Sequence, residues 1–196
     1  MKPALALLAL ASICAAHEGE PLKPHDLWTA WEFDPGITIP LILSAVLYAL
    51  GVRRAVGIRG WEIACFIAGW MTLVIALVSP VHPLGEALFS AHMAQHELLM
   101  VIAAPLLVVS RPVVVFLWAL PIAWRRRLGR AMKARSAQSI WNRLTDPFTA
   151  WLLHAAVLWG WHIPFLFQAT LTSDLVHSMQ HICFLASALL DRKSVV

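Results

Sequence analysis

The sequence predicts an all-α fold, a polytopic bundle of transmembrane helices. Hydrophobic residues make up 60% of the 196 residues, charged residues only 13%, and the mean hydropathy is +0.72. These values lie far from those of soluble globular domains and are typical of integral membrane proteins. Several apolar runs are also long enough to cross a bilayer, for which a helix needs about 20 residues.

The N-terminus has the pattern of a secretory signal peptide. Lys2 is followed by an apolar run over residues 4–13 and by the small residues of Cys14-Ala15-Ala16, an arrangement typical of a cleaved signal. We therefore expect residues 1–16 to be a signal peptide and the mature chain to begin at His17. An uncleaved first anchor is the alternative, because the next apolar run begins soon afterwards.

The remaining chain predicts one integral membrane domain over residues 17–190. About five candidate spans of suitable length follow one another, at residues 36–52, 61–79, 92–109, 148–167 and 175–190. A further apolar stretch, residues 112–123, is short and is bounded by Arg111 and Arg125. We interpret it as an extension of the third span or as a helix lying on the membrane surface.

The basic residues indicate the orientation of these spans. If the signal delivers His17 to the outer side, the basic loops after the first and third spans both face the cytoplasm, as the positive-inside rule requires. This sorting explains the net charge of +4 without nucleic acid as a partner, and the larger loop is expected to contact anionic lipid. The loops contain Arg53, Arg54 and Arg59, and then Arg125, Arg126, Arg127, Arg130, Lys133, Arg135 and Arg143.

Two histidine pairs share one spacing. They are His92-Met93-Ala94-Gln95-His96 and His177-Ser178-Met179-Gln180-His181. An i, i+4 spacing puts both imidazoles of a pair on one helix face, about 6 Å apart along the axis. Imidazole is a good ligand for copper, zinc, iron and haem. Because a polar side chain is costly within a bilayer, the pairs predict a shared functional site.

The expected topology places the histidines mainly on the outer side. Of the nine histidines, only His154 falls in the inner half of a span, where a bond to a neighbouring helix is a sufficient explanation. His162 lies at the outer end of the fourth span and is a further candidate for the site. His25 and His82 lie near the membrane surface, where solvated or capping histidines are common.

Copper suits this set of side chains. Cys14 is expected to leave with the signal, and the expected positions of Cys65 and Cys183 do not support a thiolate cage or a disulfide. Thioether sulfur beside imidazole favours copper, and the nearby Met93, Met100 and Met179 are either such sulfur donors or ordinary packing. Glu97, directly after His96, is either a partner that orients an imidazole or a helix-to-helix hydrogen bond.

Longer stretches around these histidines carry a family resemblance. The stretches are Ser79-Pro80-Val81-His82-Pro83-Leu84-Gly85, residues 88–100 around the first pair, Ala104-Pro105-Leu106-Leu107, Arg111-Pro112, Trp159-Gly160-Trp161-His162-Ile163-Pro164, the second pair, His25-Asp26-Leu27-Trp28 and Phe33-Asp34-Pro35. Together they cover nearly the whole mature chain. The chain resembles the CtaG family of cytochrome c oxidase assembly factors, the membrane type associated with caa-type oxidases.

This resemblance implies a multi-pass protein of the bacterial inner membrane that helps to mature a terminal oxidase. It implies no enzymatic activity. The expected partners are oxidase subunits, above all the copper-containing catalytic subunit, and the expected cargo is copper, taken up on the periplasmic side. The candidate copper ligands that it implies are His92, His96, His162, His177 and His181, with His82 as an addition.

The C-terminal residues depart from the family pattern. Leu190 is followed by Asp191-Arg192-Lys193-Ser194-Val195-Val196, where such proteins usually continue the span with Trp and Pro. A common sequencing-library adapter encodes these same residues. We therefore expect residues 191–196 to be a non-native tail and the last span to be truncated.

Two alternatives to an assembly factor remain open. Opposed histidines on facing helices also suit a bis-His haem protein for electron transfer. A transporter of a metal or small solute is the second alternative, with His154 and Arg111 marking a path, although the sequence shows no repeat of the kind many transporters have. An enzymatic function is not favoured, because the sequence contains no phosphate-binding loop, no H-E-x-x-H motif and no nucleophile elbow.

Overall fold

The computed structural model describes residues 29–195, so the expected signal peptide, His17 and His25 lie outside the described residues. Within that range all regular structure is helical and no strand occurs, which confirms the all-α prediction. The helices are α2 (Pro35–Arg54), α3 (Gly60–Leu77), α4 (Val81–Ala87), α5 (Phe89–Glu97), the π-helix η1 (Leu98–Ala103), α6 (Ala104–Val109), α7 (Pro112–Ala119), α8 (Ile122–Met132), α9 (Arg135–Leu144), α10 (Pro147–Trp161), α11 (Pro164–Thr172) and α12 (Asp174–Val195).

Three helical segments are long and apolar enough to cross a membrane, namely α2, α3 and the continuous α5–η1–α6 segment Phe89–Val109. A fourth span exists if α10 and α11 are counted together. The sequence predicted about five spans, and the expected fifth forms α12. Its inward face carries His177, Gln180 and His181 and its last turns carry charge, which lowers its hydropathy below that of the other spans.

The fourth expected span is bent. Residues 148–167 were predicted to be one crossing, whereas α10 ends at Trp161 and α11 begins at Pro164, with an angle of 68° between them. Pro164 has no N–H for the helix ladder and disfavours helical geometry at Ile163, which is extended with ψ at 131°. The helix therefore breaks next to His162.

Local sequence signals set the beginnings of the first two spans. The Asp34 carboxylate accepts a hydrogen bond from the Gly36 N–H at 2.9 Å, and Pro35 occupies the first helical position of α2. Glu62 Oε2 accepts a hydrogen bond from the Arg59 N–H at 2.8 Å before α3. Both contacts satisfy N–H groups that have no partner within the helix.

Residues 112–123 do not extend the third span. Arg111 adopts a left-handed conformation with φ of 50°, which ends α6 and turns the chain so that α7 packs against α2. A Cβ atom on Gly51 would lie only 2.1 Å from the Val115 carbonyl oxygen, so the two helix backbones touch at this glycine. The Arg54 guanidinium donates to the Ala119 carbonyl at 2.8 Å and ties the end of α7 to α2.

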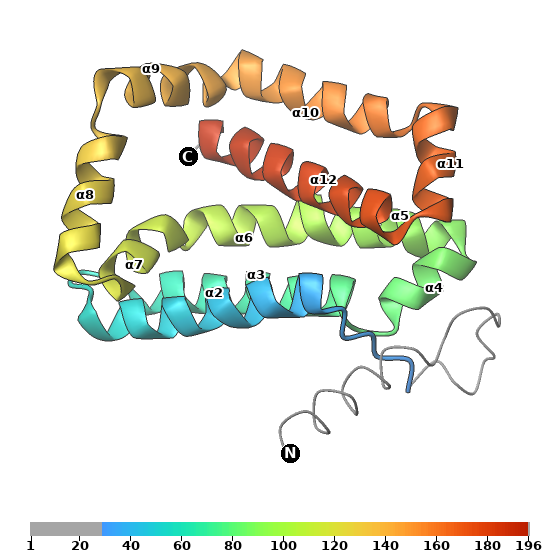
Figure 1. Cartoon of the computed structure of the whole chain (residues 1–196), viewed down its shortest axis with the longest axis horizontal. Coiled ribbons are helices and arrows are strands. Elements are labelled where there is room, and N and C mark those ends of the chain that lie inside the picture. Colours follow the sequence, from blue (N-terminus) through green and yellow to red (C-terminus); the bar gives the residue numbers. More distant parts are fainter. Residues whose placement is uncertain (1–28, 196) are drawn as a thin grey trace, which may run out of the picture.

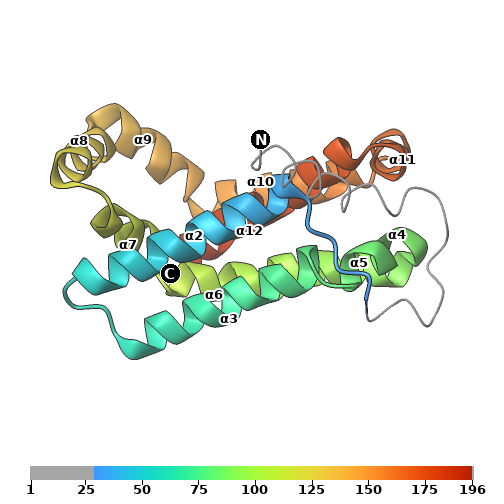
Figure 2. The same cartoon turned by 60° about the horizontal axis from the view of Figure 1, so that its bottom comes forward.

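The long helices lie side by side and the short helices occupy the two ends of the molecule (Figures 1 and 2). α4 and α11 lie at one end, and α7 and α8 lie at the opposite end. The apolar core fills the space between α2, α3, the third span and α7, with Tyr48, Phe66, Leu73, Leu99 and Val115 among its buried side chains. α12 packs against both η1 and α6 on one side and α10 on the other.

Candidate metal centre

The two histidine pairs meet at the end of the molecule that carries α4 and α11. His92 and His96 lie on α5, and their ring centroids are 4.2 Å apart. His177 and His181 lie on α12, with ring centroids 4.4 Å apart. Because α12 packs along the third span, the pairs face each other. His92 lies 5.3 Å from His177, and His96 lies 5.3 Å from His181, between ring centroids. We call these residues the four-histidine cluster.

The cluster is removed from solvent. The exposed fractions of its residues are 3% for His92, 2% for His96, 6% for His177 and 4% for His181. An imidazole buried at this depth is expected to bond through its nitrogens, because an unpaired buried polar group costs about 1–3 kcal/mol.

Most cluster nitrogens nevertheless have no hydrogen-bond partner. The buried unpartnered atoms are His92 Nε2, both ring nitrogens of His96, His177 Nε2 and both ring nitrogens of His181. Among the described histidines, such atoms occur only in the two predicted pairs. Each neutral imidazole offers one nitrogen lone pair, and several such lone pairs close together are the kind of donor set that metal ions prefer. The chemistry of these side chains, though not their present arrangement, is therefore suited to a metal ion.

The rings are packed against one another and do not converge on one point. Within residues 29–195 no group of three or more His, Cys, Asp or Glu side chains already has the arrangement needed to hold a metal ion. The ring planes of His92 and His96 meet at 67°, and those of His96 and His181 at 76°. An edge-to-face contact directs a ring edge at a ring face, so metal binding requires the imidazoles to rotate about their side-chain torsions.

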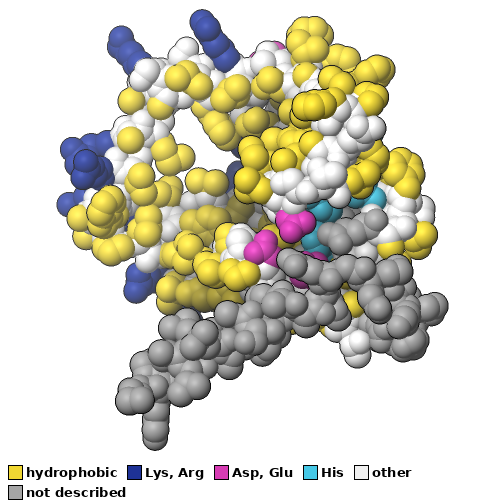
Figure 3. Space-filling model, turned by 45° about the vertical axis from the view of Figure 1, so that its right-hand side comes forward, with side chains coloured by type: hydrophobic (Ala, Val, Ile, Leu, Met, Phe, Trp, Pro, Cys, Tyr) yellow, Lys and Arg dark blue, Asp and Glu magenta, His cyan; other side chains and the backbone are white. Residues whose placement is uncertain are grey.

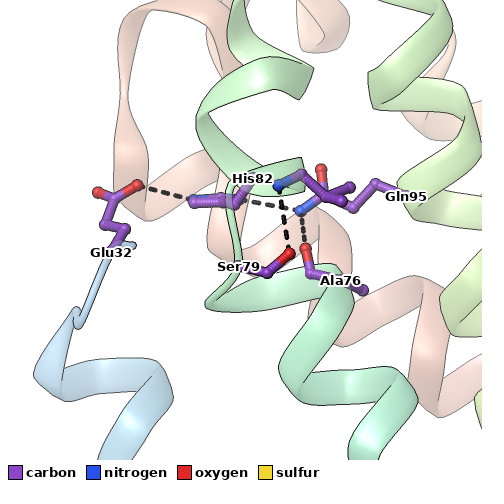
Figure 4. Close-up of polar contacts among 6 residues, drawn as sticks. Glu32, Ala76, Ser79, His82 and Gln95 are labelled. Atoms are coloured by element: carbon purple, nitrogen blue, oxygen red, sulfur yellow. Dashed lines mark hydrogen bonds and ion pairs between the residues drawn. The ribbon is translucent and has the colours of Figure 1, made fainter. Parts of the chain in front are cut away.

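His82 on α4 borders the cluster, but its Nδ1 is already hydrogen-bonded and its Nε2 faces a carboxylate. Its ring centroid lies 5.4 Å from that of His177 and 6.0 Å from that of His181. His82 Nδ1 lies 2.9 Å from Gln95 Nε2, and His82 Nε2 lies 3.7 Å from the Glu32 carboxylate (Figure 4). Burial lowers the pKa of His82, although the nearby carboxylates of Glu32, Asp34 and Asp174 act in the opposite direction. The predicted solvated or capping role therefore does not describe His82, which is 8% exposed.

The other described candidates lie outside the cluster. His162 follows α10 and is exposed; its Nδ1 is 2.6 Å from the Leu158 carbonyl oxygen. The Phe184 ring is 6.2 Å from His162 and 4.6 Å from His96 between centroids, so both histidines contact this phenylalanine. His154 bonds to Ser187 Oγ on α12 at 3.0 Å, the helix-to-helix bond that its position predicted.

Sulfur and carboxylate groups contribute little to the cluster itself. Met179 is 51% exposed, and the Glu97 side chain next to His96 is exposed as well. Met93 and Met100 are partly buried. Cys65 and Cys183 are free thiols, on α3 and α12. The possible metal ligands in and around the cluster are therefore mainly imidazoles.

Sequence reasoning missed the glutamines of the two pairs. Gln95 and Gln180 are 0% and 1% exposed, and the side-chain oxygen of each has no hydrogen-bond partner. They occupy the same position in a shared His-x-x-Gln-His pattern, and this repeated amide was the available signal. Glu32, which contacts His82, had no signal in the sequence because its position depends on how the segment before α2 runs past α4.

The chain is similar to several mycobacterial proteins. Uncharacterized proteins of Mycobacterium bovis and Mycobacterium tuberculosis are each 36% identical over 135 residues, which is 66% of this chain and 18% of the relative. An uncharacterized protein of Mycobacterium leprae is 38% identical over 103 residues, covering 49% of this chain and 15% of its own length. The chain thus spans about one fifth of these curated relatives.

No solved structure matches this chain. The family model described as cytochrome c oxidase caa3 assembly factor matches residues 46–195, a range that contains all the long helices except the start of α2 and includes the whole four-histidine cluster. The chain belongs to the family of cytochrome c oxidase caa3 assembly factors.

Proposed function

We propose that this protein assists the assembly of a cytochrome c oxidase by holding copper in the four-histidine cluster and passing it to the copper-containing catalytic subunit. The buried and unpartnered imidazole nitrogens of His92, His96, His177 and His181 carry the proposal. An assembly factor for this enzyme handles a protein whose maturation needs metal, and imidazole is a ligand well suited to copper.

The arrangement of the cluster supports a cargo site. α5 and α12 each supply one pair, so a small movement of α12 relative to the third span changes both ring contacts between the pairs, His92 with His177 and His96 with His181. The imidazoles can rotate about their side-chain torsions to bind an ion and rotate back when the ion leaves. A site of this kind binds copper without the rigid cage that would retain it.

The proposed site lies at the outer, periplasmic end of the bundle. The basic residues of α8 and α9 lie at the end opposite to α4 and α11 (Figure 1). Because basic loops stay in the cytoplasm, this separation supports an orientation in which the histidines face outward, where copper is delivered to the oxidase.

The test compares copper binding by the unmodified full chain with that of histidine variants, each in nanodiscs. We expect His92→Ala/His96→Ala and His177→Ala/His181→Ala to reduce bound copper at least tenfold by elemental analysis, because each removes half of the ligands. His154→Ala is the matched control, since it removes a membrane histidine bonded outside the cluster. In cells, the paired variants should lower oxidase activity and added copper should restore part of it. Unchanged copper content together with intact oxidase activity would contradict the proposal.

A bis-His haem is the remaining alternative for these side chains. The rings of His92 and His177 stack with an interplanar angle of 28°, so they would have to rotate for haem as they would for copper, and a porphyrin needs far more space than a single ion. Purified protein that shows a Soret band stoichiometric with the chain would favour haem over copper.

A further inference from the structure

The side-chain amide of Gln95 donates a hydrogen bond to a free backbone carbonyl at the C-terminal end of α3. The Ala76 carbonyl stands four residues before Pro80, and proline has no N–H to donate to it. Gln95 Nε2 instead donates to the Ala76 oxygen at 2.6 Å. A carbonyl oxygen only accepts hydrogen bonds, so this contact identifies the nitrogen of the Gln95 amide and determines which way the amide faces.

The same amide nitrogen determines the tautomer of His82. The second N–H of Gln95 Nε2 points to His82 Nδ1 at 2.9 Å (Figure 4). His82 Nδ1 must then be the acceptor and carry no proton. A neutral imidazole has one N–H, so the proton of His82 is on Nε2, which faces Glu32 Oε2 at 3.7 Å. Figure 3 shows acidic side chains next to histidine on this face of the molecule.

His82 is therefore close to the cluster but chemically different from it. Its ring stacks on that of His177 with an interplanar angle of 18°. Its Nδ1 has a hydrogen-bond partner and its Nε2 faces a carboxylate, whereas each histidine of the cluster has at least one buried nitrogen without a partner. Bringing His82 to a metal would break the bond to Gln95 and leave a buried amide N–H without an acceptor.

We propose that Gln95 is a positioning residue that sets the number of ligands in the metal site, by holding Nδ1 of His82 as a hydrogen-bond acceptor and so excluding a fifth imidazole. The inference rests on the proposed function, because it concerns the same site. It assigns His82 to the wall of the site and leaves the four-histidine cluster as the ligand set. The number of imidazoles determines how tightly copper is held and how readily it can be passed on.

The experiment uses the full chain in nanodiscs loaded with Cu(II) alone. Electron paramagnetic resonance measures the nitrogens bound to the ion. We expect His82→Gln to retain the copper content and the spectrum of the unmodified protein. We expect Gln95→Leu, which is similar in size but cannot donate, to free His82 Nδ1, add one nitrogen to the spectrum and tighten binding about tenfold. The double variant Gln95→Leu/His82→Gln should return to the original spectrum.

Gln180→Leu is the matched control, because it changes the equivalent residue of the second pair and should add no nitrogen. A spectrum of Gln95→Leu identical to that of the unmodified protein would overturn the inference. Loss of copper, or of one bound nitrogen, in His82→Gln would also overturn the inference. The His82→Gln measurement decides the question even if Gln95→Leu does not fold. If the unmodified protein binds no copper, the proposed function itself is contradicted. Failure of the proposed function can therefore be distinguished from failure of the inference about Gln95.

Discussion

At the scale of single residues, the main feature is polar groups that are buried at a cost to the fold. His96 and His181 each bury both ring nitrogens without a partner. His154, in contrast, satisfies Nδ1 with Ser187. Residues that weaken a protein without a compensating contact are typical of functional sites. The cost should therefore be measurable when the metal is absent.

Replacing His96 with Leu should stabilise the metal-free protein. The change removes two unpartnered nitrogens, keeps a similar volume and preserves an apolar contact with Phe184, whose ring is 4.6 Å away. Each unpaired group costs about 1–3 kcal/mol, so we expect a rise of several degrees in Tm together with loss of copper binding. Thermal unfolding in detergent with a chelator present measures the shift.

His154→Leu is the control for this prediction. It breaks the bond to Ser187 Oγ on α12 and leaves that hydroxyl without its histidine partner, so the Tm should fall or stay constant. A drop in Tm for His96→Leu equal to that of His154→Leu would show that His96 has a stabilising partner in the metal-free protein.

At the scale of helices, the apolar runs predicted the three long spans and the tertiary contacts decided the short elements. Runs of apolar residues are sufficient for α2, α3 and the third span, because a membrane helix satisfies its own backbone. The path of α7 depends on contacts between segments distant in sequence. It lies against α2 because Gly51 lets the Val115 backbone approach.

Gly51→Ala should separate α2 from α7. The added Cβ would lie 2.1 Å from the Val115 oxygen and 2.7 Å from its Cγ1, so one backbone must move and the Arg54 bond to Ala119 is strained. We expect a clearly lower Tm and a smaller yield of folded protein in size-exclusion chromatography.

Gly129→Ala provides the comparison within the same protein. An added Cβ there meets nothing within 4 Å, and alanine is about 1 kcal/mol better than glycine inside a helix. Its Tm should stay the same or rise slightly. Equal destabilisation by the two substitutions would show that the contact between α2 and α7 does not depend on Gly51.

At the scale of the whole molecule, charge and histidine are separated along the bundle. The arginines of α8 and α9 lie at the end opposite to α4 and α11 (Figure 1). α8 and α9 have no buried residues, so their cationic and apolar side chains are available to a lipid surface. The histidine end carries Glu32, Asp34 and Asp174 near His82.

Thiol labelling in intact cells tests this orientation. In a background with Cys65→Ala and Cys183→Ala, we expect Thr172→Cys on α11 to react with a membrane-impermeant maleimide from the periplasmic side. Ser136→Cys on α9 should react only after the cells are lysed. Both positions are exposed, so the difference reports the side of the membrane. Labelling of Ser136→Cys in intact cells would reverse the orientation and move the site to the cytoplasmic side.

The sequence alone determined the membrane class, the long spans and the two histidine pairs. Length and hydropathy are properties of a continuous segment, and an i, i+4 spacing puts His92 beside His96 on any helix. The same reasoning treated residues 148–167 as one straight span, because the apolar composition continues through the break at Pro164.

Only the tertiary structure decided which histidines meet and which are already bonded. His82 and Gln95 come together because α4 folds back on α5 and Pro80 leaves the Ala76 carbonyl free for the amide. His162 is exposed, and its Nδ1 lies 2.6 Å from the Leu158 carbonyl oxygen. Hydrogen bonds between helices depend on three-dimensional approach and are not encoded in spacing along the chain. For that reason only the structure could distinguish the four histidines whose buried nitrogens lack partners from His82 and His162.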